Sequence, residues 1–402
     1  MTLEEIAPPN WGARLGAAWD RLLTEAADPT IFLSFPWIDA WWRHFGGGSR
    51  PRLVTVWDDG GNLQGLAPLY ARQLRLAGLP GPRVLRLMGD EGVGSEYLGF
   101  LLRRDVQEEV LRRLAEHLRE DWSLLDFHGL REDSAAAQVI PEVLSWPVHG
   151  RVHWERHPCS LIRLPGDYQA YLASLPQKFR STVRYRTNKL VKNFQVRMLR
   201  TQREEEVAPH LDRFFFLHQA RWIAEGHPGS FYSAPKRAFY DEVSREFLRR
   251  GWLRFYHLEV DGVIRASQFG FAFNGVLHSL QEAFDRDFHP QGVGGVGVVL
   301  RGMAIEDCIA EGLRGYDFLG GIEEFKTRWG SVTHYVNRVR IGAPGPSGAM
   351  AFHATAGVRR LKDWARERSP AWLTRGRESL RAWRRTRRSR RAGAQHAVGG
   401  GG

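Results

Sequence analysis

Two stretches of the chain share one pattern of hydrophobic and polar positions. Residues 53–71 (LVTVWDDGGNLQGLAPLYA) have apolar runs on either side of an Asp-Asp-Gly-Gly turn, and residues 254–273 (RFYHLEVDGVIRASQFGFAF) repeat this plan around Asp261 and Gly262. Apolar runs that flank a short Gly-containing turn are typical of a β-hairpin. We therefore predict one hairpin in each half of the chain.

The segments that follow the two hairpins also correspond. The first is followed by the strand-like VLRLMGD, a helical pattern over residues 106–119, and WSLLDFHGL. The second is followed by VLHSLQEAF, a helical pattern over residues 295–311, and GYDFLGG. LDFHG therefore corresponds to YDFLGG, and Asp126 to Asp317. We interpret the chain as two copies of one α/β unit, ordered hairpin, strand, helix, strand.

Helical periodicity precedes each hairpin. In the first copy it covers residues 13–25 and 36–45, and in the second it covers residues 168–175, 177–192, 205–224 and 235–249. The Pro-containing segment 131–160 is expected to be a crossover, and GAPGPSG at 342–348 a linker. The predicted domains are residues 1–150, residues 151–341, and a linker with a tail over residues 342–402.

Charge is concentrated at one end of the chain. The formal net charge is +12, but residues 357–402 hold 14 Lys and Arg against three acidic residues, so the preceding body is nearly neutral. Nucleic acid is thus an unlikely ligand of the body.

The two cysteines, Cys159 and Cys308, match no metal-ligand spacing, and we expect no metal site. The acidic N-terminus and the absence of a run of about 18 apolar residues favour a cytoplasmic protein.

A glycine-rich stretch opens the predicted helix at residue 295. Residues 292–297 (GVGGVG) match the dinucleotide fingerprint G-x-G-x-x-G, and Asp317 follows Gly297 by 20 residues. Residues 285–290 separate this match from the preceding strand, however, which disfavours a Rossmann oxidoreductase that binds NAD. A glycine-rich loop before a helix still offers N–H groups to an anion such as a pyrophosphate. Close helix–sheet packing is the alternative reading.

Several motifs resemble a known family when taken together. They are LPQKFRSTVRYR with Arg180 and Arg184, HQARW at 218–222, AFDRDFHPQGVG at 283–294 and DFLGGIEEFKTRWG at 317–330. FLSFPWIDAWW and SEYLGF in the first half add to them. The chain resembles the tandem acyltransferases of the GNAT superfamily, in particular the CelD-like group associated with cellulose and exopolysaccharide synthesis, which is related to the Fem-type aminoacyl transferases. This resemblance implies two tandem GNAT-like domains of mixed α/β class.

The resemblance also implies a donor site in the second domain. An acyl-CoA, most simply acetyl-CoA, would lie where the strand near 279–284 separates from the one near 316–319, or an aminoacyl-tRNA would in the Fem branch. Gln291, Gly292, Gly294 and Gly295 would bind its pyrophosphate, with Gly294 in the place of the family glycine and Val296 departing from the usual loop. Glu282 and Asp317 are the candidate bases, and Lys326 could pair with a carboxylate or steady a negative group. A structural role at a strand end is the alternative for Asp317, and a solvated loop position is the alternative for Lys326.

The acceptor side is assigned to basic and aromatic helices. Arg180 and Arg184 could hold an anionic acceptor such as a sugar phosphate, and a solvated face is their alternative. His218 and Trp222 are further candidates, although His218 could simply cap an apolar helix face.

The tail, with Trp364, Trp372 and Trp383 among arginines, suits an anionic membrane surface. Nucleic-acid binding and plain disorder are the alternatives for this segment. The expected function is acyl transfer to a hydroxyl or amine of a sugar or cell-envelope precursor, by a cytoplasmic protein that could attach to the inner membrane face. A non-catalytic membrane-associated scaffold remains the non-enzymatic alternative.

Overall fold

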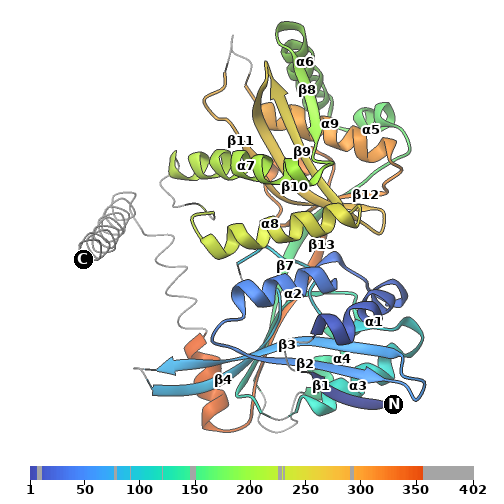
Figure 1. The fold of residues 1–402 in the computed structure, drawn as a ribbon, viewed down its shortest axis with the longest axis vertical. Helices are drawn as coiled ribbons and strands as arrows, with labels where there is room; N and C mark the ends of the chain where they lie inside the picture. Colours follow the sequence, from blue (N-terminus) through green and yellow to red (C-terminus); the bar gives the residue numbers. More distant parts are fainter. Residues whose placement is uncertain are drawn as a thin grey trace, which may run out of the picture.

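The strands of this computed structural model form one mixed sheet that runs through both halves of the chain (Figure 1). The structure describes residues 1–6, 11–76, 79–90, 92–119, 121–144, 151–224, 229, 231–289 and 294–355. The sheet has 13 strands in the order β1-β2-β3-β4-β6-β13-β7-β12-β11-β10-β9-β8, with the short β5 paired to β3. This order reads as two similar sets of strands that meet at β13 and β7.

The first half forms one end of the sheet. Its strands are β1 (Thr2–Ile6), β2 (Arg50–Trp57), β3 (Leu63–Leu76), β4 (Leu79–Leu87), β5 (Leu101–Leu102) and β6 (Leu124–Arg131). Its helices are α1 (Trp11–Glu25), η1 (Ile31–Leu33), α2 (Phe35–Phe45), η2 (Arg104–Val106), α3 (Gln107–His117) and α4 (Ala135–Leu144).

The second half repeats the arrangement. Its strands are β7 (Arg151–Arg163), β8 (Val196–Arg200), β9 (Leu253–Val260), β10 (Val263–Phe273), β11 (Val276–Phe284), β12 (Gly315–Gly320) and β13 (Val332–Gly342). Its helices are α5 (Tyr168–Ser174), α6 (Gln177–Asn193), α7 (Glu204–Ala224), α8 (Ala234–Arg249), α9 (Val296–Ala310) and α10 (Glu324–Arg328). Both predicted hairpins are present as β2–β3 and β9–β10, each antiparallel.

The two halves exchange strands at their junction. β7, which follows the first half in sequence, pairs with β12 of the second, while β13, which ends the second half, pairs with β6 of the first. β7 and β13 also pair with each other from Val332 opposite Leu161 to Gly342 opposite Arg151. Because these ladders cross between the halves, neither half completes its own sheet.

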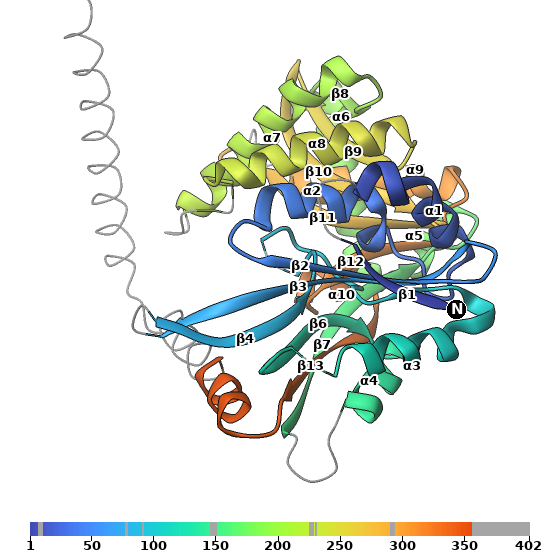
Figure 2. The same cartoon turned by 60° about the horizontal axis from the view of Figure 1, so that its bottom comes forward.

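Helices cover both faces of the sheet and join the halves. In Figure 2, α1 and α2 lie on one side of the first-half strands, and α3 and α4 on the other. In the second half, α7 packs on β10 and β11, and α9 packs with α6 at a separate core. The α2 residue Trp37 is fully buried against Phe239, Phe247 and Phe271 of the second half, so one aromatic core spans the junction. Burying aromatic side chains of this size is a major favourable contribution to stability.

Two segments differ from their sequence-based interpretation. The predicted crossover at 131–160 contains helix α4 and most of strand β7, in which Pro158 faces Tyr335 of β13. The predicted linker at 342–348 runs into a helix that covers residues 346–355. Strands β1, β8 and β13 do not correspond to any strand expected from the sequence.

Candidate functional site

The central feature of the second half is the point at which β11 and β12 separate. The two strands are parallel and pair at only three positions, which end with His278 opposite Asp317. Beyond His278, β11 pairs with β10 alone in the described part of the chain. Successive side chains of a strand point to opposite faces. Tyr316 and Phe318 accordingly pack in the core around α9, while Asp317 faces the opposite side.

Asp317 is the centre of a buried group of polar side chains, which we call the polar cluster. Its carboxylate accepts hydrogen bonds from the Leu319 backbone N–H and the Tyr97 hydroxyl, both at 2.7 Å. His278 Nδ1 lies 3.5 Å from Asp317 Oδ2. The polar cluster consists of Glu96, Tyr97, His278, Asp317, Lys326 and His334. It draws on both halves of the chain.

The direction of the Tyr97 hydrogen bond also fixes the state of His334. Tyr97 donates its single proton to Asp317, and His334 Nε2 lies 2.7 Å from the same hydroxyl oxygen. His334 Nε2 must therefore donate, so Nε2 carries the proton when the ring is neutral. Burial lowers the pKa of His334, with the charge of Asp317 acting against this, so the neutral ring is favoured.

Glu96 is the second carboxylate of the polar cluster. Burial and the charge of Asp317 raise the pKa of Glu96 to about 7, and Lys326 partly opposes this shift. Lys326 is 5% exposed, donates to the Gly320 carbonyl and pairs with Glu323 at 2.9 Å. Lys326 is therefore a buried residue that fixes the turn after β12, rather than a solvated loop lysine.

Three buried polar atoms around the polar cluster are left without a hydrogen-bond partner among the described residues. They are Glu96 Oε2, His278 Nδ1 and His334 Nδ1. Buried polar groups are normally satisfied, and an unsatisfied one costs free energy. Three such atoms in one place indicate a position where a polar ligand would bind.

Glu282 lies on the opposite face from Asp317. Its carboxylate forms a two-pronged ion pair with Arg301 of α9, which is 6% exposed. The Arg301 guanidinium also lies 5.0 Å from the Phe325 ring centroid and 5.7 Å from that of Trp329. A carboxylate bound in this way neutralises the buried arginine, so the geometry favours a structural role for Glu282.

A pocket of about 480 Å³ opens beside Arg301, and we call it the basic pocket. Helices α6, α9 and α10 supply its walls. It is lined by Pro176, Lys178, Phe179, Thr182, Arg186, Val298, Arg301, Phe325, Arg328 and Trp329. Apart from Arg301, whose charge Glu282 offsets, the pocket holds three cationic and three aromatic side chains, which fit a ligand that combines anionic groups with a flat ring.

The N-terminus of α9 lies next to this pocket. Gly295 precedes the helix with φ of 93°, and no side chain caps the first turn. A Cβ atom at Gly295 would lie 2.3 Å from the Arg186 guanidinium, so Arg186 sits directly on the helix start. The helix dipole and Arg186 both favour an anion there. Gly294 adjoins this point, while Gln291 and Gly292 lie outside the described residues.

The remaining predicted residues lie elsewhere. Arg180 donates to the Ala173 carbonyl and Arg184 to Gln169, so both turn towards α5 and neither lines the basic pocket. His218 is 2% exposed and accepts from Trp222 Nε1 at 3.0 Å, in contact with Phe231. The structure thus brings Asp317 and Lys326 together, and places Glu282 beside the basic pocket.

Sequence reasoning did not assign roles to Glu96, Tyr97, His278 or His334. Glu96 and Tyr97 lie in SEYLGF, which contributes to the family resemblance but carries no chemical signature of its own. Lys178 and Arg186 share α6 with Arg180 and Arg184, and helical spacing alone could not tell which face of α6 meets the pocket.

Comparisons with known proteins show what the sequence and the fold are similar to. Residues 177–327 match a family model described as an acetyltransferase (GNAT) domain. The structure of FemX superposes with a TM-score of 0.58 at 11% sequence identity, covering 84% of this chain and 96% of that one. A conserved protein of unknown function from Bacteroides thetaiotaomicron gives 0.50 at 15% identity, covering 85% of this chain and 100% of that one.

A tandem GNAT protein from the clavulanic acid biosynthesis pathway gives a TM-score of 0.42 at 13% identity, covering 86% of this chain and 99% of that one. No curated protein matches the sequence.

The predicted fold class is confirmed: the chain has a mixed α/β fold of tandem GNAT-like units. Its second half contains a GNAT acetyltransferase domain, and the protein is an acyltransferase. The described residues contain no group of three His, Cys, Asp or Glu side chains that could hold a metal ion. Within that same part of the chain, no helix is long and apolar enough to cross a membrane.

Proposed function

We propose that the protein transfers an acyl group, most simply acetyl, from acyl-CoA to a hydroxyl or amine of a sugar or cell-envelope precursor. The observation that carries this proposal is the separation of β11 and β12 after His278 and Asp317. Arg301 of the basic pocket pairs with Glu282 on one face of these strands, and the polar cluster lies on the other face. A donor and an acceptor could therefore meet at the same pair of strands from opposite sides.

The basic pocket fits the chemistry of CoA. Arg186 and the first turn of α9 would hold the pyrophosphate, and Lys178 and Arg328 could bind a further phosphate. Phe179 or Trp329 could stack with the adenine ring. The close contact around Gly295 supports this placement, since a Cβ there would displace Arg186.

The polar cluster fits the chemistry of the transfer. Attack on a thioester needs a group that accepts the proton of the nucleophile, and a positioned carboxylate or imidazole can do so. Asp317, proposed from the sequence as a base, lies at the separation of the strands together with Glu96 and His278. We propose the CelD-like, exopolysaccharide-associated acceptor class on the sequence motifs alone.

Isothermal titration of the purified protein with CoA, acetyl-CoA and NAD tests the donor. We expect CoA and acetyl-CoA to bind and NAD not to bind. Binding of NAD instead would restore the oxidoreductase alternative, and binding of neither would contradict the CoA assignment. In the Fem-type alternative, with an aminoacyl-tRNA donor, tRNA would bind to the basic pocket and CoA would not.

A peripheral position at the inner face of the membrane is the second part of the proposal. It rests on the charge and tryptophan content of the tail, whose residues 356–402 lie outside the described part of the chain. Truncation after Gly348 is expected to abolish sedimentation with anionic liposomes while CoA binding is kept. Unchanged sedimentation of the truncated protein would contradict membrane attachment through the tail.

A further inference from the structure

One loop of the first half reaches the site of the second half. Residues 92–100, between β4 and β5, place Glu96 and Tyr97 against β12. A Cβ atom at Gly320 would lie 2.6 Å from Glu96 Oε1, so the carboxylate rests directly on the end of β12. The loop therefore adds two functional side chains that the second half does not contain itself.

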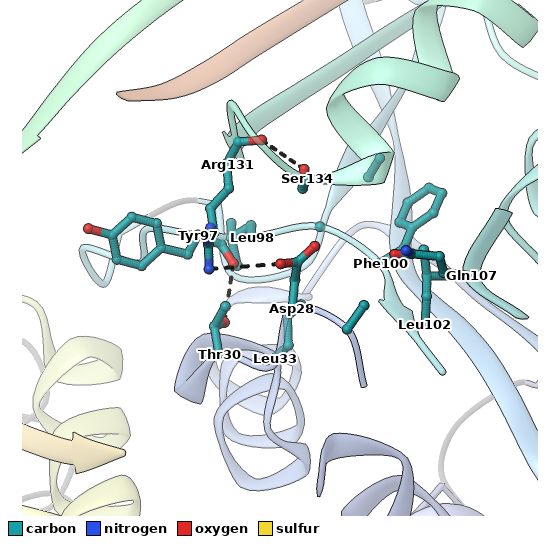
Figure 3. A pocket seen from close by; sticks show the side chains of 13 residues that line it. Asp28, Thr30, Leu33, Tyr97, Leu98, Phe100, Leu102, Gln107, Arg131 and Ser134 are labelled. Atoms are coloured by element: carbon teal, nitrogen blue, oxygen red, sulfur yellow. Dashed lines mark hydrogen bonds and ion pairs between the residues drawn. The ribbon is translucent and has the colours of Figure 1, made fainter. Parts of the chain in front are cut away.

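The loop is held in place by buried contacts from three other elements. Thr30 donates to the Tyr97 carbonyl at 3.2 Å, and Trp37 Nε1 donates to the Ser95 hydroxyl at 2.9 Å. Tyr240 of α8 donates to the Val93 carbonyl at 3.4 Å. Figure 3 shows Thr30 holding the Tyr97 backbone while the Tyr97 ring points away from Asp28. The position of Glu96 is thus set by both halves.

The backbone is strained on both sides of this contact. Tyr97 has φ of 52° and Leu319 has φ of 60°. Bulky residues rarely adopt this region, and such strain is concentrated at functional sites. In this conformation the Leu319 N–H points to Asp317. Tyr97, in its own left-handed conformation, contacts the same carboxylate through its hydroxyl.

The two carboxylates of the polar cluster have different surroundings. Both carboxylate oxygens of Asp317 accept a hydrogen bond, one from Tyr97 and one from Leu319. Glu96 Oε2 has no hydrogen-bond partner among the described residues, and Glu96 faces Asp317 of β12, Lys326 of α10 and Cys159 of β7. A buried carboxyl group with a free oxygen, next to a second carboxylate that is fully hydrogen-bonded, is suited to accept a proton.

We infer that Glu96, carried by the first half, is the catalytic residue that accepts the proton of the attacking amine or hydroxyl at the site of the second half. The inference rests on the proposed function. The nucleophile's lone pair forms a bond to the thioester carbonyl carbon, and its proton passes to Glu96. The carbon–sulfur bond breaks with its electron pair on sulfur, and the thiolate takes the proton from Glu96. No proton is consumed overall, and Glu96 returns to its carboxylate form.

The titration of Glu96 can be measured without knowing the acceptor. The full-length protein is labelled with ¹³C at glutamate side-chain carboxyls, and the wild type is compared with Glu96→Gln. Glu109→Gln is the matched control, because Glu109 lies exposed on α3 and pairs only with Arg113 among the described residues. We expect one signal that titrates near pH 7 in the wild type and in Glu109→Gln, and its loss in Glu96→Gln. A Glu96 signal that titrates near the ordinary value of about 4.3 would overturn the inference.

Thiol release from acetyl-CoA, with glucosamine as the amine probe, gives the second readout. We expect kcat of the wild type to rise with pH through an apparent pKa near 7, and Glu96→Gln to lose about 10²–10⁴-fold in kcat. The dissociation constant for CoA should stay unchanged in Glu96→Gln. A variant that keeps the wild-type rate and pH profile would overturn the inference. Failure of the wild type to bind CoA would instead contradict the proposed function, and the carboxyl titration would still decide whether Glu96 holds the proton.

Discussion

The Tyr97 hydroxyl donates to Asp317 Oδ2 over 2.7 Å, although the two residues lie 220 positions apart in the sequence. Tyr97 belongs to the first half and Asp317 to the second, so this hydrogen bond joins the two units at the point where β11 and β12 separate. The strand exchange through β7 and β13 holds the same junction from the other side. The candidate site is therefore a property of the whole chain rather than of one unit.

Tyr97→Phe should measurably destabilise the protein. The substitution removes the donor to Asp317 and the acceptor for His334 Nε2, and it leaves both groups buried. A hydrogen bond to a charged group contributes about 1.5–3 kcal/mol, so we expect a loss of about 2 kcal/mol in the free energy of unfolding. Urea unfolding measures it, with the exposed Tyr185→Phe as the control. Equal stabilities of the two variants would contradict the hydrogen-bond network.

The basic pocket predicts which arginines bind the donor. Arg186→Ala combined with Arg328→Ala should weaken CoA binding at least about tenfold, because both side chains line the pocket. Arg180→Ala combined with Arg184→Ala also removes two positive charges, but these two side chains lie outside the pocket. This pair of substitutions should therefore leave CoA affinity nearly unchanged. Calorimetry of the two pairs distinguishes a local contact from a general charge effect. Equal losses in both would place the donor elsewhere.

Gly295→Ala should affect both stability and CoA binding. Its φ of 93° disfavours any side chain, and a Cβ atom would displace Arg186 from the start of α9. Gly251→Ala is the matched control, because Gly251 has φ of 70° and no atom within 4 Å of the added Cβ. We expect both variants to lose about 1 kcal/mol of stability, and only Gly295→Ala to lose CoA affinity. Normal CoA binding by Gly295→Ala would exclude Arg186 as a pyrophosphate ligand.

Most element types could be predicted because they depend on local pattern. The hairpins β2–β3 and β9–β10, as well as helix α9, follow from apolar periodicity and glycine positions. The central strands were missed for a physical reason. β7 alternates polar and partly exposed residues over much of its length and contains Pro158, which resembles a loop. Its partners lie on β12 and β13, over 150 residues later, and no local pattern reports such pairing.

The candidate site was predictable in part. Asp317 and Lys326 could be identified because they lie in one motif after the α9 helix. Glu96 and His334 could not be assigned, since they meet Asp317 only through the strand exchange and the loop at 92–100. Sequence reasoning also could not separate Asp317 from Asp126, which hold corresponding positions in the two units.

Glu96→Gln should remove a pH dependence of stability. The pKa of Glu96 is about 7 in the folded protein and about 4.3 in an unfolded chain, so between these values the folded state binds more protons. Stability relative to Glu96→Gln should then fall as pH rises from about 4.3 to 7, by roughly 4 kcal/mol in all. His210, His257 and His334, whose pKa values burial lowers, shift stability in the opposite direction in both proteins and cancel in the difference. Urea unfolding at several pH values measures this difference, and a constant difference would mean that Glu96 is not protonated at pH 6.

Asp126 and Asp317 should respond differently to the same substitution. Asp126 accepts from Arg338 Nε and Nη2, both at 2.7 Å, and lies 3.5 Å from Arg86. Burial alone would raise the pKa of Asp126, but the hydrogen bonds and charges of these arginines hold it below its ordinary value. Asp126→Asn removes the buried negative charge that faces the Arg338 and Arg86 guanidinium groups, which should cost about 3 kcal/mol of stability.

No arginine among the described residues pairs with Asp317, and the Asn oxygen can still accept from Leu319. The Asn amide nitrogen replaces Oδ2 and can donate to the Tyr97 hydroxyl, which can then donate to His334 Nε2 in its other tautomer. Asp317→Asn should therefore change stability by less than about 1 kcal/mol while it reduces acyl transfer. Parallel urea unfolding and thiol-release assays on the two variants measure this contrast. If Asp317→Asn were as unstable as Asp126→Asn and retained full activity per folded molecule, Asp317 would be a structural strand-end residue like its counterpart.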